Sequence, residues 1–212
     1  MNSLSWLYSK CRVSQSSFPV VLLSYGLHRL RGKRILCNHK TIIRGITNIE
    51  TNGLLQIGMS YVGFIHKYDV TYLNINGRLI FNGGYSIGKG CRFDIGQNAV
   101  ATFGTGYVNS NTTFIIMHGL SVGEGCSIGW GCQFLDEDFH EIQYAGKRNR
   151  DKTIVIGDRV WIGCNVSVMK GASIADGCVV AAHSVVTERF EEQDCLIAGN
   201  PAQIVKRNIQ WA

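Results

Sequence analysis

Among the six histidines of the chain, His140 stands in the setting that best suits acid–base chemistry. It follows Asp136, Glu137 and Asp138 in a polar stretch, and an imidazole titrates near neutrality, which suits a general base. Asp138 or Asp136 could orient the imidazole and favour its charged form, and a backbone carbonyl could orient it equally well. The competing interpretation is a histidine that is simply exposed beside solvated acids.

Asn111, within Asn109-Ser110-Asn111-Thr112-Thr113-Phe114, is a second candidate for a chemical role. Its side-chain amide can donate a hydrogen bond to a substrate oxygen and can also accept one. Asparagine also tolerates the left-handed backbone of tight turns, so a purely structural role at a turn stays open.

The element that carries these residues is indicated by an aliphatic residue at every sixth position. The clearest run consists of Ile156, Ile162, Val168, Ile174, Val180 and Val186. A small residue stands four positions after each of the first five, at 160, 166, 172, 178 and 184. Neither a helix nor a simple strand has this period, which is typical of a β-solenoid with one short strand per repeat. The same phase occurs at 116–134 and 75–93, and more weakly at 43–55.

The runs are separated by steps that are not multiples of six, which predicts interruptions near 95–115 and 135–155. The second is the longer, and we expect a loop at 136–152 that projects from the solenoid. Such loops leave a stack at its corners and often carry function. His140 lies in this loop.

Cysteine and histidine spacing argues against disulfide and metal chemistry. The eight cysteines include no C-x-x-C pair. Cys91, Cys126, Cys132 and Cys178 fall in the small inward column, where a thiol behaves as a small hydrophobic group. A zinc site built from histidines would need three of them to converge on one metal, and no two of the six histidines lie close together in the sequence. We therefore predict buried free thiols and no metal.

Length and composition are those of one domain of 212 residues, with 25 glycines and 2 prolines. The chain has no apolar run of membrane-spanning length and no clear signal peptide, so a cytoplasmic protein is expected. Much of the net charge of +6 lies at 29–44. This basic stretch is either a solvated edge or a contact with a phosphate-bearing substrate or the inner face of the cell membrane. It lacks the interleaved aromatic residues of nucleic-acid-binding segments, so no nucleic-acid partner is predicted.

Three segments follow from these patterns. We expect residues 1–40 to form a short helical cap, because they lack the repeat and the open end of a solenoid needs cover. Residues 41–190 are predicted to be the stacked coils, with the loop 136–152, and residues 191–212 a basic tail.

Several motifs resemble the hexapeptide-repeat acyltransferases, most closely the galactoside, maltose and surface-polysaccharide O-acetyltransferases. The motifs are Val160-Trp161-Ile162-Gly163, Val168-Met169-Lys170-Gly171-Ala172-Ser173-Ile174, Ser184-Val185-Val186-Thr187 and Ala198-Gly199-Asn200-Pro201-Ala202. The resemblance spans about residues 75–207 and implies a left-handed parallel β-helix, an all-β fold. It further implies a homotrimer that transfers an acetyl group from acetyl-CoA, with active sites between subunits.

The resemblance also assigns residues. It implies that His140 is the general base and that Asn111 faces it across the subunit groove. The groove that binds coenzyme A would be lined by Trp161, Cys164, Ala182, Thr187 and Lys206. Three positions depart from the usual pattern: His183 replaces a common glycine, and Glu188 and Gln203 replace frequent basic residues. These changes bear on how the phosphates are bound.

The expected reaction is therefore O-acetylation of a sugar hydroxyl, in the biosynthesis of a surface polysaccharide or another glycan. An N-acyltransferase that acts on a nucleotide-linked amino sugar is the first alternative. A non-catalytic solenoid scaffold is the second, because a fold alone does not prove an activity.

Overall fold

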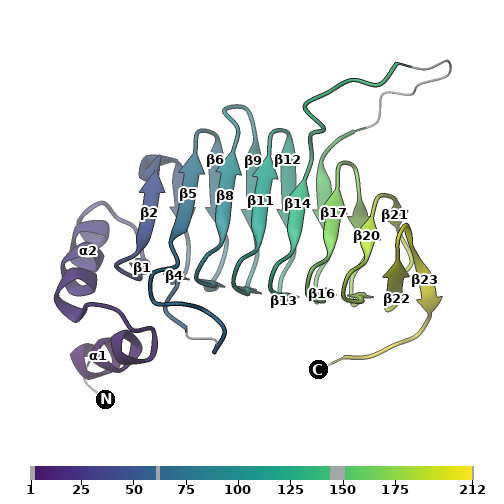
Figure 1. Cartoon of the computed structure of the whole chain (residues 1–212). Coiled ribbons are helices and arrows are strands. Elements are labelled where there is room, and N and C mark those ends of the chain that lie inside the picture. The colour runs from purple at the N-terminus through teal and green to yellow at the C-terminus, as the bar shows by residue number, and fades with distance from the viewer. Residues whose placement is uncertain (1–2, 61–62, 144–150, 212) are drawn as a thin grey trace.

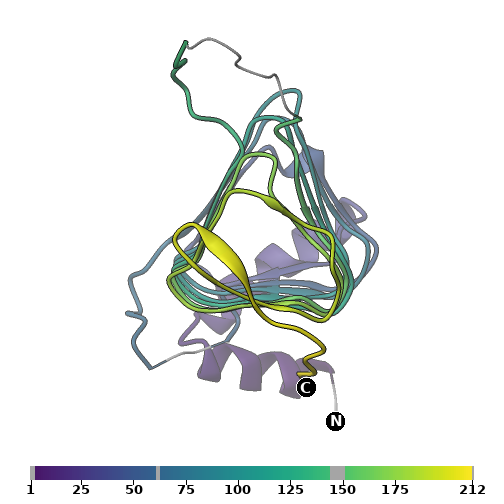
Figure 2. The same ribbon diagram turned by 90° about the vertical axis from the view of Figure 1, so that its right-hand side faces the viewer.

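The computed structural model describes residues 3–60, 63–143 and 151–211. Short strands wind into a stack of coils (Figure 1), and the view along the stack shows a triangular section (Figure 2). Each coil has three sides, and the strands on the same side of successive coils form one sheet. We call the three sheets A, B and C.

Sheet A contains β1 (Ile35–Cys37), β4 (Leu55–Ile57), β7 (Tyr85–Ile87), β10 (Gly106–Val108), β13 (Cys126–Ile128), β16 (Trp161–Ile162), β19 (Val179–Val180), β22 (Leu196–Gly199) and β23 (Ala202–Lys206). Sheet B contains β2 (Thr41–Arg44), β5 (Thr71–Ile75), β8 (Arg92–Ile95), β11 (Thr113–Ile116), β14 (Gln133–Leu135), β17 (Ser167–Met169) and β20 (Val185–Val186). Sheet C contains β3 (Ile49–Thr51), β6 (Arg78–Phe81), β9 (Val100–Phe103), β12 (Gly119–Val122), β15 (Ile154–Ile156), β18 (Ser173–Ile174) and β21 (Arg189–Phe190). Neighbouring strands are parallel except β22 and β23.

The chain passes from sheet A to sheet B, then to sheet C, at three corners of each coil. In the coil of Asn111, the AB corner is 109–112, the BC corner is 117–118 and the CA corner is 123–125. In Figure 2 the C-terminal coils face the viewer, and the chain winds clockwise toward the viewer through these corners. This is a left-handed coil, so the predicted left-handed parallel β-helix is confirmed, against the usual right-handed rule for parallel crossovers.

The predicted aliphatic columns form the core. Ile162 is fully buried and stands in register with Ile128 below it and Val180 above it. The corner after it needs a glycine, because a Cβ atom on Gly163 would lie 2.7 Å from the backbone nitrogen of Ala182. The inward column of sheet B carries stacked rings in the earlier coils, namely Phe93, Phe114 and Phe134, and Val168 follows Phe134 in register.

The prediction of buried free thiols is confirmed for Cys91, Cys126, Cys132 and Cys178, each of which is buried and unpaired. Burial raises the pKa of Cys91 to about 12 and the pKa values of Cys126 and Cys132 to about 11. These thiols are therefore neutral packing groups at physiological pH.

Two helices, α1 (Ser3–Val13) and α2 (Phe18–Leu30), lie at the N-terminal end of the stack (Figure 1). Leu7 and Val21 pack with Leu36 and Met59 in a cluster separate from the main core. A single-turn helix, η1 (Ile46–Asn48), joins β2 to β3. β1 starts at Ile35, before residue 41, so the first strand of sheet A lies within the segment predicted to be the cap. In the described part of the chain, no helix has the length and apolar character needed to cross a membrane.

Candidate functional site

The projecting loop leaves the stack at the BC corner after β14, as expected from the polar interruption (Figures 1 and 2). Its first residue, Asp136, is fully buried. Its carboxylate accepts hydrogen bonds from the backbone N–H groups of Met117 (2.6 Å), His118 (2.8 Å) and Gly119 (2.8 Å) in the coil below. Because these bonds occupy the carboxylate, Asp136 anchors the loop and is not placed to orient His140.

Glu137 closes the neck of the loop. Its Oε2 atom lies 2.7 Å from Nε2 of His118 and also accepts a hydrogen bond from Nζ of Lys152, at the far end of the loop. Lys152 and His118 together lower the pKa of Glu137 from 4.5 to about 2. The carboxylate therefore stays charged at neutral pH and holds both ends of the loop to one corner.

Asp138, the predicted partner of His140, forms an ion pair with Lys170 at the BC corner of the next coil. The structure thus gives this carboxylate a second anchoring contact. A role of Asp138 beside His140 stays a prediction, and it would require the Lys170 pair to open or to be shared.

His140 follows these anchors in the loop, and its side chain is exposed. Within the described residues, its imidazole has no hydrogen-bond partner, and Phe139 before it is exposed and adopts a φ of 62°. An imidazole in this position is open to a substrate. The residues 144–150 that complete the loop lie outside the described part of the chain.

Asn111 occupies the AB corner with a φ of 61°. Gly90, Gly131, Asn165 and His183 hold the same place in other coils, each with a positive φ. A Cβ atom on Gly90 would lie 2.1 Å from Oδ1 of Asn111, so the amide folds over the glycine below. The turn interpretation of Asn111 is therefore confirmed for its backbone, and a contact with substrate stays a prediction.

The same corner explains why His183 can replace the common glycine. His183 adopts a φ of 61°, and its Nε2 atom lies 3.5 Å from Nδ2 of Asn165 in the coil below. The position needs a left-handed backbone, which glycine and asparagine supply easily and histidine less often.

Asn111 and the loop of His140 stand at opposite edges of sheet B in one chain. Asn111 precedes β11 at the AB corner, whereas the loop leaves β14 at the BC corner. A single chain therefore does not bring the two predicted residues together.

The residues assigned to the coenzyme A groove also lie in two separate places in one chain. Trp161 is exposed on the outer face of sheet A, and Lys206 ends β23 in register with Leu196. Cys164 and Ala182 lie at successive AB corners, as the hydrogen bond from the His183 N–H to the Cys164 carbonyl indicates. Thr187 follows β20 at the BC corner. In one chain these residues form a strip along sheet A and the AB corner, with Thr187 apart from it.

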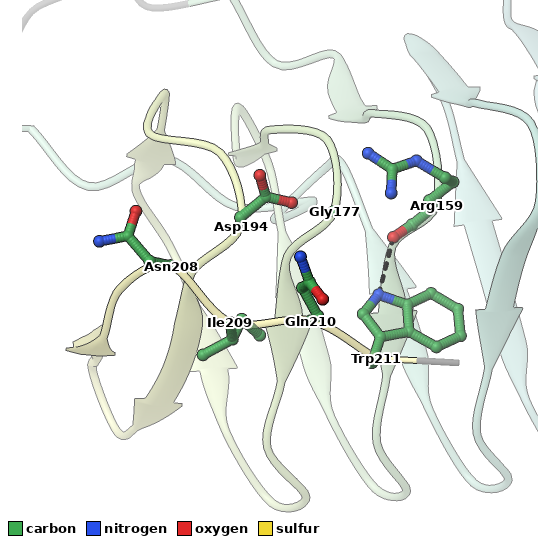
Figure 3. A pocket seen from close by; sticks show the side chains of 7 residues that line it. All are labelled: Arg159, Gly177, Asp194, Asn208, Ile209, Gln210 and Trp211. Carbon is green, nitrogen blue, oxygen red and sulfur yellow. Dashed lines mark hydrogen bonds between the residues drawn. The ribbon is translucent and has the colours of Figure 1, made fainter.

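A cavity of about 470 Å³ lies instead at the CA corner, under the C-terminal tail (Figure 3). It is lined by Arg159, Gly177, Asp194, Asn208, Ile209, Gln210 and Trp211. The indole N–H of Trp211 donates a 3.0 Å hydrogen bond to the Arg159 carbonyl, and the Trp211 ring lies 6.1 Å from the ring of Trp161. No sequence pattern predicted this cavity, because it forms only when the C-terminal tail folds back over the preceding coils.

Segment 58–70, which joins β4 to β5 at the AB corner, holds another feature that the sequence analysis missed. The ring of Phe64 lies 5.8 Å from that of Trp130, and both are exposed. Trp130 stands at the AB corner directly above Ser110 and Asn111, as the hydrogen bond from Gly131 N–H to the Ser110 carbonyl indicates. The signal available in the sequence was the break in the repeat between Ile57 and Thr71, which contains several aromatic residues.

Two histidines considered for a metal site lie far from each other. His118 contacts Glu137 at the BC corner, and His183 contacts Asn165 at the AB corner. Among the described residues, no three His, Cys, Asp or Glu side chains are grouped to hold a metal ion.

Comparison with known proteins agrees with the winding of the chain and with the predicted motifs. The pattern of the bacterial transferase hexapeptide family (six repeats) matches residues 153–188. An uncharacterized 24.8 kDa protein in cps region of Klebsiella pneumoniae is 41% identical over 211 residues, which cover 98% of this chain and 95% of the relative. The chain belongs to the hexapeptide-repeat acyltransferases.

More distant members of the family have named activities. The putative lipopolysaccharide biosynthesis O-acetyl transferase of Escherichia coli (strain K12) is 50% identical over 54 residues, 26% of this chain and 27% of that protein. The crystal structure of a polySia-specific acetyltransferase superposes with a TM-score of 0.52 at 26% identity, and covers 84% of this chain and 77% of that one. The alignment with the Escherichia coli protein spans about a quarter of its length, so its acceptor is not carried over to this chain.

Proposed function

We propose that the protein is an acetyl-CoA-dependent O-acetyltransferase that acts on a sugar hydroxyl in surface-polysaccharide biosynthesis. The observation that carries the proposal is His140, whose imidazole is exposed on a loop that Asp136 and Glu137 clamp to a hexapeptide β-helix. The acetyltransferase names of relatives with the same fold support the reaction class.

In the proposed reaction, Nε2 or Nδ1 of His140 takes the proton from the acceptor hydroxyl as the oxygen attacks the thioester carbonyl. The carbonyl oxygen becomes an oxyanion, which the amide N–H of Asn111 can stabilise. When the carbon–sulfur bond breaks, the imidazolium returns its proton to the sulfur of coenzyme A. The products are the O-acetyl sugar and coenzyme A, and His140 is neutral again.

A shared active site follows from the positions of His140 and Asn111. They lie at opposite edges of sheet B, and we propose that each site takes His140 from one chain and Asn111 from another. A closed ring of three chains with head-to-tail contacts makes three such sites and leaves no edge unmatched. We therefore propose a homotrimer.

Coenzyme A would lie along the strip of Trp161, Cys164 and Ala182, with Thr187 near the loop. An apolar groove suits the pantetheine arm, and cations suit the phosphates. Arg207 is engaged with Glu192 at 3.0 Å, so we assign the phosphate contact to Lys206.

The acceptor is proposed to bind between Asn111 and the pair formed by Phe64 and Trp130. A pyranose ring has a face of C–H groups, and an exposed aromatic surface can bury such a face while its rim stays polar. The pair lies one coil above Asn111, on the side of the AB corner that would face the partner's His140 loop. Because acetyl-CoA is a cytoplasmic metabolite, we place the reaction in the cytoplasm.

The purified protein should release coenzyme A from acetyl-CoA in the presence of one class of acceptor within a panel. The panel contains free sugars, nucleotide-linked sugars with and without an amino group, lipid-linked sugars and serine. Nuclear magnetic resonance of the product then locates the acetyl group on oxygen or nitrogen. Acetylation at nitrogen would replace the proposal with the amino-sugar alternative, and no transfer to any acceptor would contradict it.

A further inference from the structure

Helix α2 is apolar on two opposite faces. One face carries Phe18, Val21 and Tyr25, which pack against α1, β1 and Met59. The other carries four large side chains that are exposed by 50%, 67%, 48% and 86%, namely Val20, Leu23, Leu27 and Leu30. Their spacing of three, four and three residues places them in one stripe along the helix.

The neighbouring helix α1 carries exposed apolar side chains of its own. Leu4 and Tyr8, one turn apart, are 57% and 53% exposed, and the Tyr8 ring packs on Phe18, on the face of α2 opposite the outer stripe. A helix on the surface of a globular protein normally presents a polar face outward, and an apolar outer face is normally covered by a partner. A partner is therefore expected to cover the outer stripe of α2.

Charge indicates what that partner is. Of the 21 Lys and Arg residues of the chain, 8 lie in residues 1–49, whereas all 15 Asp and Glu residues come later. A second copy of the cap would bring two basic surfaces together, which opposes self-association through this face. An anionic bilayer surface offers both an apolar interior and a complementary charge.

Some of the basic residues at 29–44 are engaged within the chain, and the others are exposed for contact with a lipid surface. Lys33 bonds to the carbonyl of Ile49, and Lys40 and Arg44 lie over the rings of Tyr68 and Tyr72. Arg29, Arg31 and Arg34 are exposed, and Arg29 and Arg31 flank Leu30, the most exposed leucine of the stripe.

We infer that the N-terminal cap docks the protein on an anionic lipid surface, with the outer stripe of α2 in the headgroup–acyl boundary and Arg29, Arg31 and Arg34 among the lipid headgroups. The cap forms one end of the stack, and the loop of His140 leaves the side of later coils (Figure 1). Docking therefore leaves the proposed site open. If the proposed trimer has its axis along the stack, three caps face the same way and act together.

The test is flotation of the full-length protein with vesicles that contain or lack phosphatidylglycerol. The wild-type protein should float with anionic vesicles and stay behind with purely zwitterionic ones. Leu23→Gln/Leu27→Gln should lower binding at least about tenfold, because two apolar side chains no longer enter the boundary. Substitution of Arg29, Arg31 and Arg34 by glutamine should lower binding to anionic vesicles about fivefold for each cation removed, at low salt.

A matched control is Val100→Gln/Val155→Gln, which changes two side chains that are 39% and 40% exposed on sheet C and should leave binding unchanged. Melting temperatures confirm that each variant is folded. Equal flotation of the leucine variant and wild type, or no flotation of wild type with anionic vesicles, would overturn the inference. A leucine variant that loses oligomer mass by light scattering would show that a second copy covers the face instead.

Acetyl transfer to a soluble acceptor, measured in the same preparations, keeps this inference separate from the proposed function. The leucine variant should transfer at the wild-type rate in the absence of vesicles. If no preparation transfers acetyl groups while flotation behaves as expected, the proposed function fails and the docking surface stands.

Discussion

Nε2 of His118 lies 2.7 Å from Oε2 of Glu137, and the same carboxylate binds Lys152. One side chain thus joins the start of the projecting loop, the end of that loop and the coil beneath it. Because a loop that carries a catalytic group must place it closely, the contact between Glu137 and His118 connects the geometry of a corner to the chemistry proposed for His140.

Glu137→Gln should loosen the neck of the loop and lower kcat by roughly 10- to 100-fold, since small displacements of a catalytic group are costly. The KM for acetyl-CoA should change little. Wild-type kinetics in the pure variant would mean that the contact does not position the loop.

The clamp also has a defined dependence on pH. The pKa of Glu137 is lowered from 4.5 to about 2 in the folded protein, so its ion pairs favour the clamped loop above about pH 4.5. That contribution is lost as the pH falls from 4.5 toward 2. Hydrogen exchange should show a more mobile loop in Glu137→Gln than in wild type at neutral pH, and the difference should disappear at the acid end. A difference that persists undiminished at the acid end would mean that the charge of Glu137 is not its cause.

His140→Ala should leave the fold and the binding of acetyl-CoA intact and lower turnover by roughly 10² to 10⁴, the usual contribution of a general base. Gln143→Ala, an exposed substitution three residues later in the same loop, is the matched control and should retain activity. Near-normal turnover of pure His140→Ala would remove His140 from the mechanism.

Cys164 provides a test of the proposed coenzyme A strip. It is the one cysteine of the eight that is partly exposed, while the other seven are buried. Alkylation of the native protein should therefore modify Cys164 first, as read by mass spectrometry, and acetyl-CoA, which has no free thiol, should protect it. Cys164→Ser supplies the unmodified baseline. Equal labelling with and without saturating acetyl-CoA would place the coenzyme elsewhere.

The six-residue spacing was enough to predict the sheets and the core, because every inward position of a regular coil meets the same environment. Ile162 and Val180 could be placed in one column without knowledge of any contact. The anchors of the loop could not be placed in this way. From the sequence alone, Asp136 is expected to be a solvent-exposed acid. Only the stacking of the coils brings three backbone N–H groups to its carboxylate.

The pair formed by Phe64 and Trp130 was unpredictable for a related reason. Phe64 lies in the break of the repeat between β4 and β5, whereas Trp130 lies between β13 and β14, several coils later, and their rings nevertheless meet. No period links them. Interruptions of a repeat therefore indicate where function lies, but not which side chains come together there.

Ile162→Asp should prevent folding or disperse the protein. The side chain is fully buried between Ile128 and Val180, and its loss costs about 1.5–3 kcal/mol before the larger cost of an unpaired buried charge. Val155→Asp, at an outward position of sheet C, is the control and should fold. A soluble Ile162→Asp protein with an unchanged melting temperature would show that the core phase is wrong.

The shared active site can be tested by mixing two inactive variants. Asn111→Gly removes the amide without strain, because Gly90 and Gly131 already occupy the same left-handed corner in neighbouring coils. It should lower kcat by roughly 10²–10³, as expected for a lost oxyanion donor, while Asn165→Gly at the corresponding corner of a later coil should not.

An equimolar mixture of His140→Ala and Asn111→Gly chains, allowed to exchange at random, should recover about a quarter of the wild-type turnover. About one interface in four of the whole population then joins an intact His140 to the partner's intact Asn111, and these interfaces all lie in mixed trimers. Light scattering and native mass spectrometry establish that mixed trimers have formed. A protein that is monomeric under active conditions would refute the trimer. Mixed trimers without recovered activity would show that each chain builds its site alone, by moving the loop of His140 across its own sheet B.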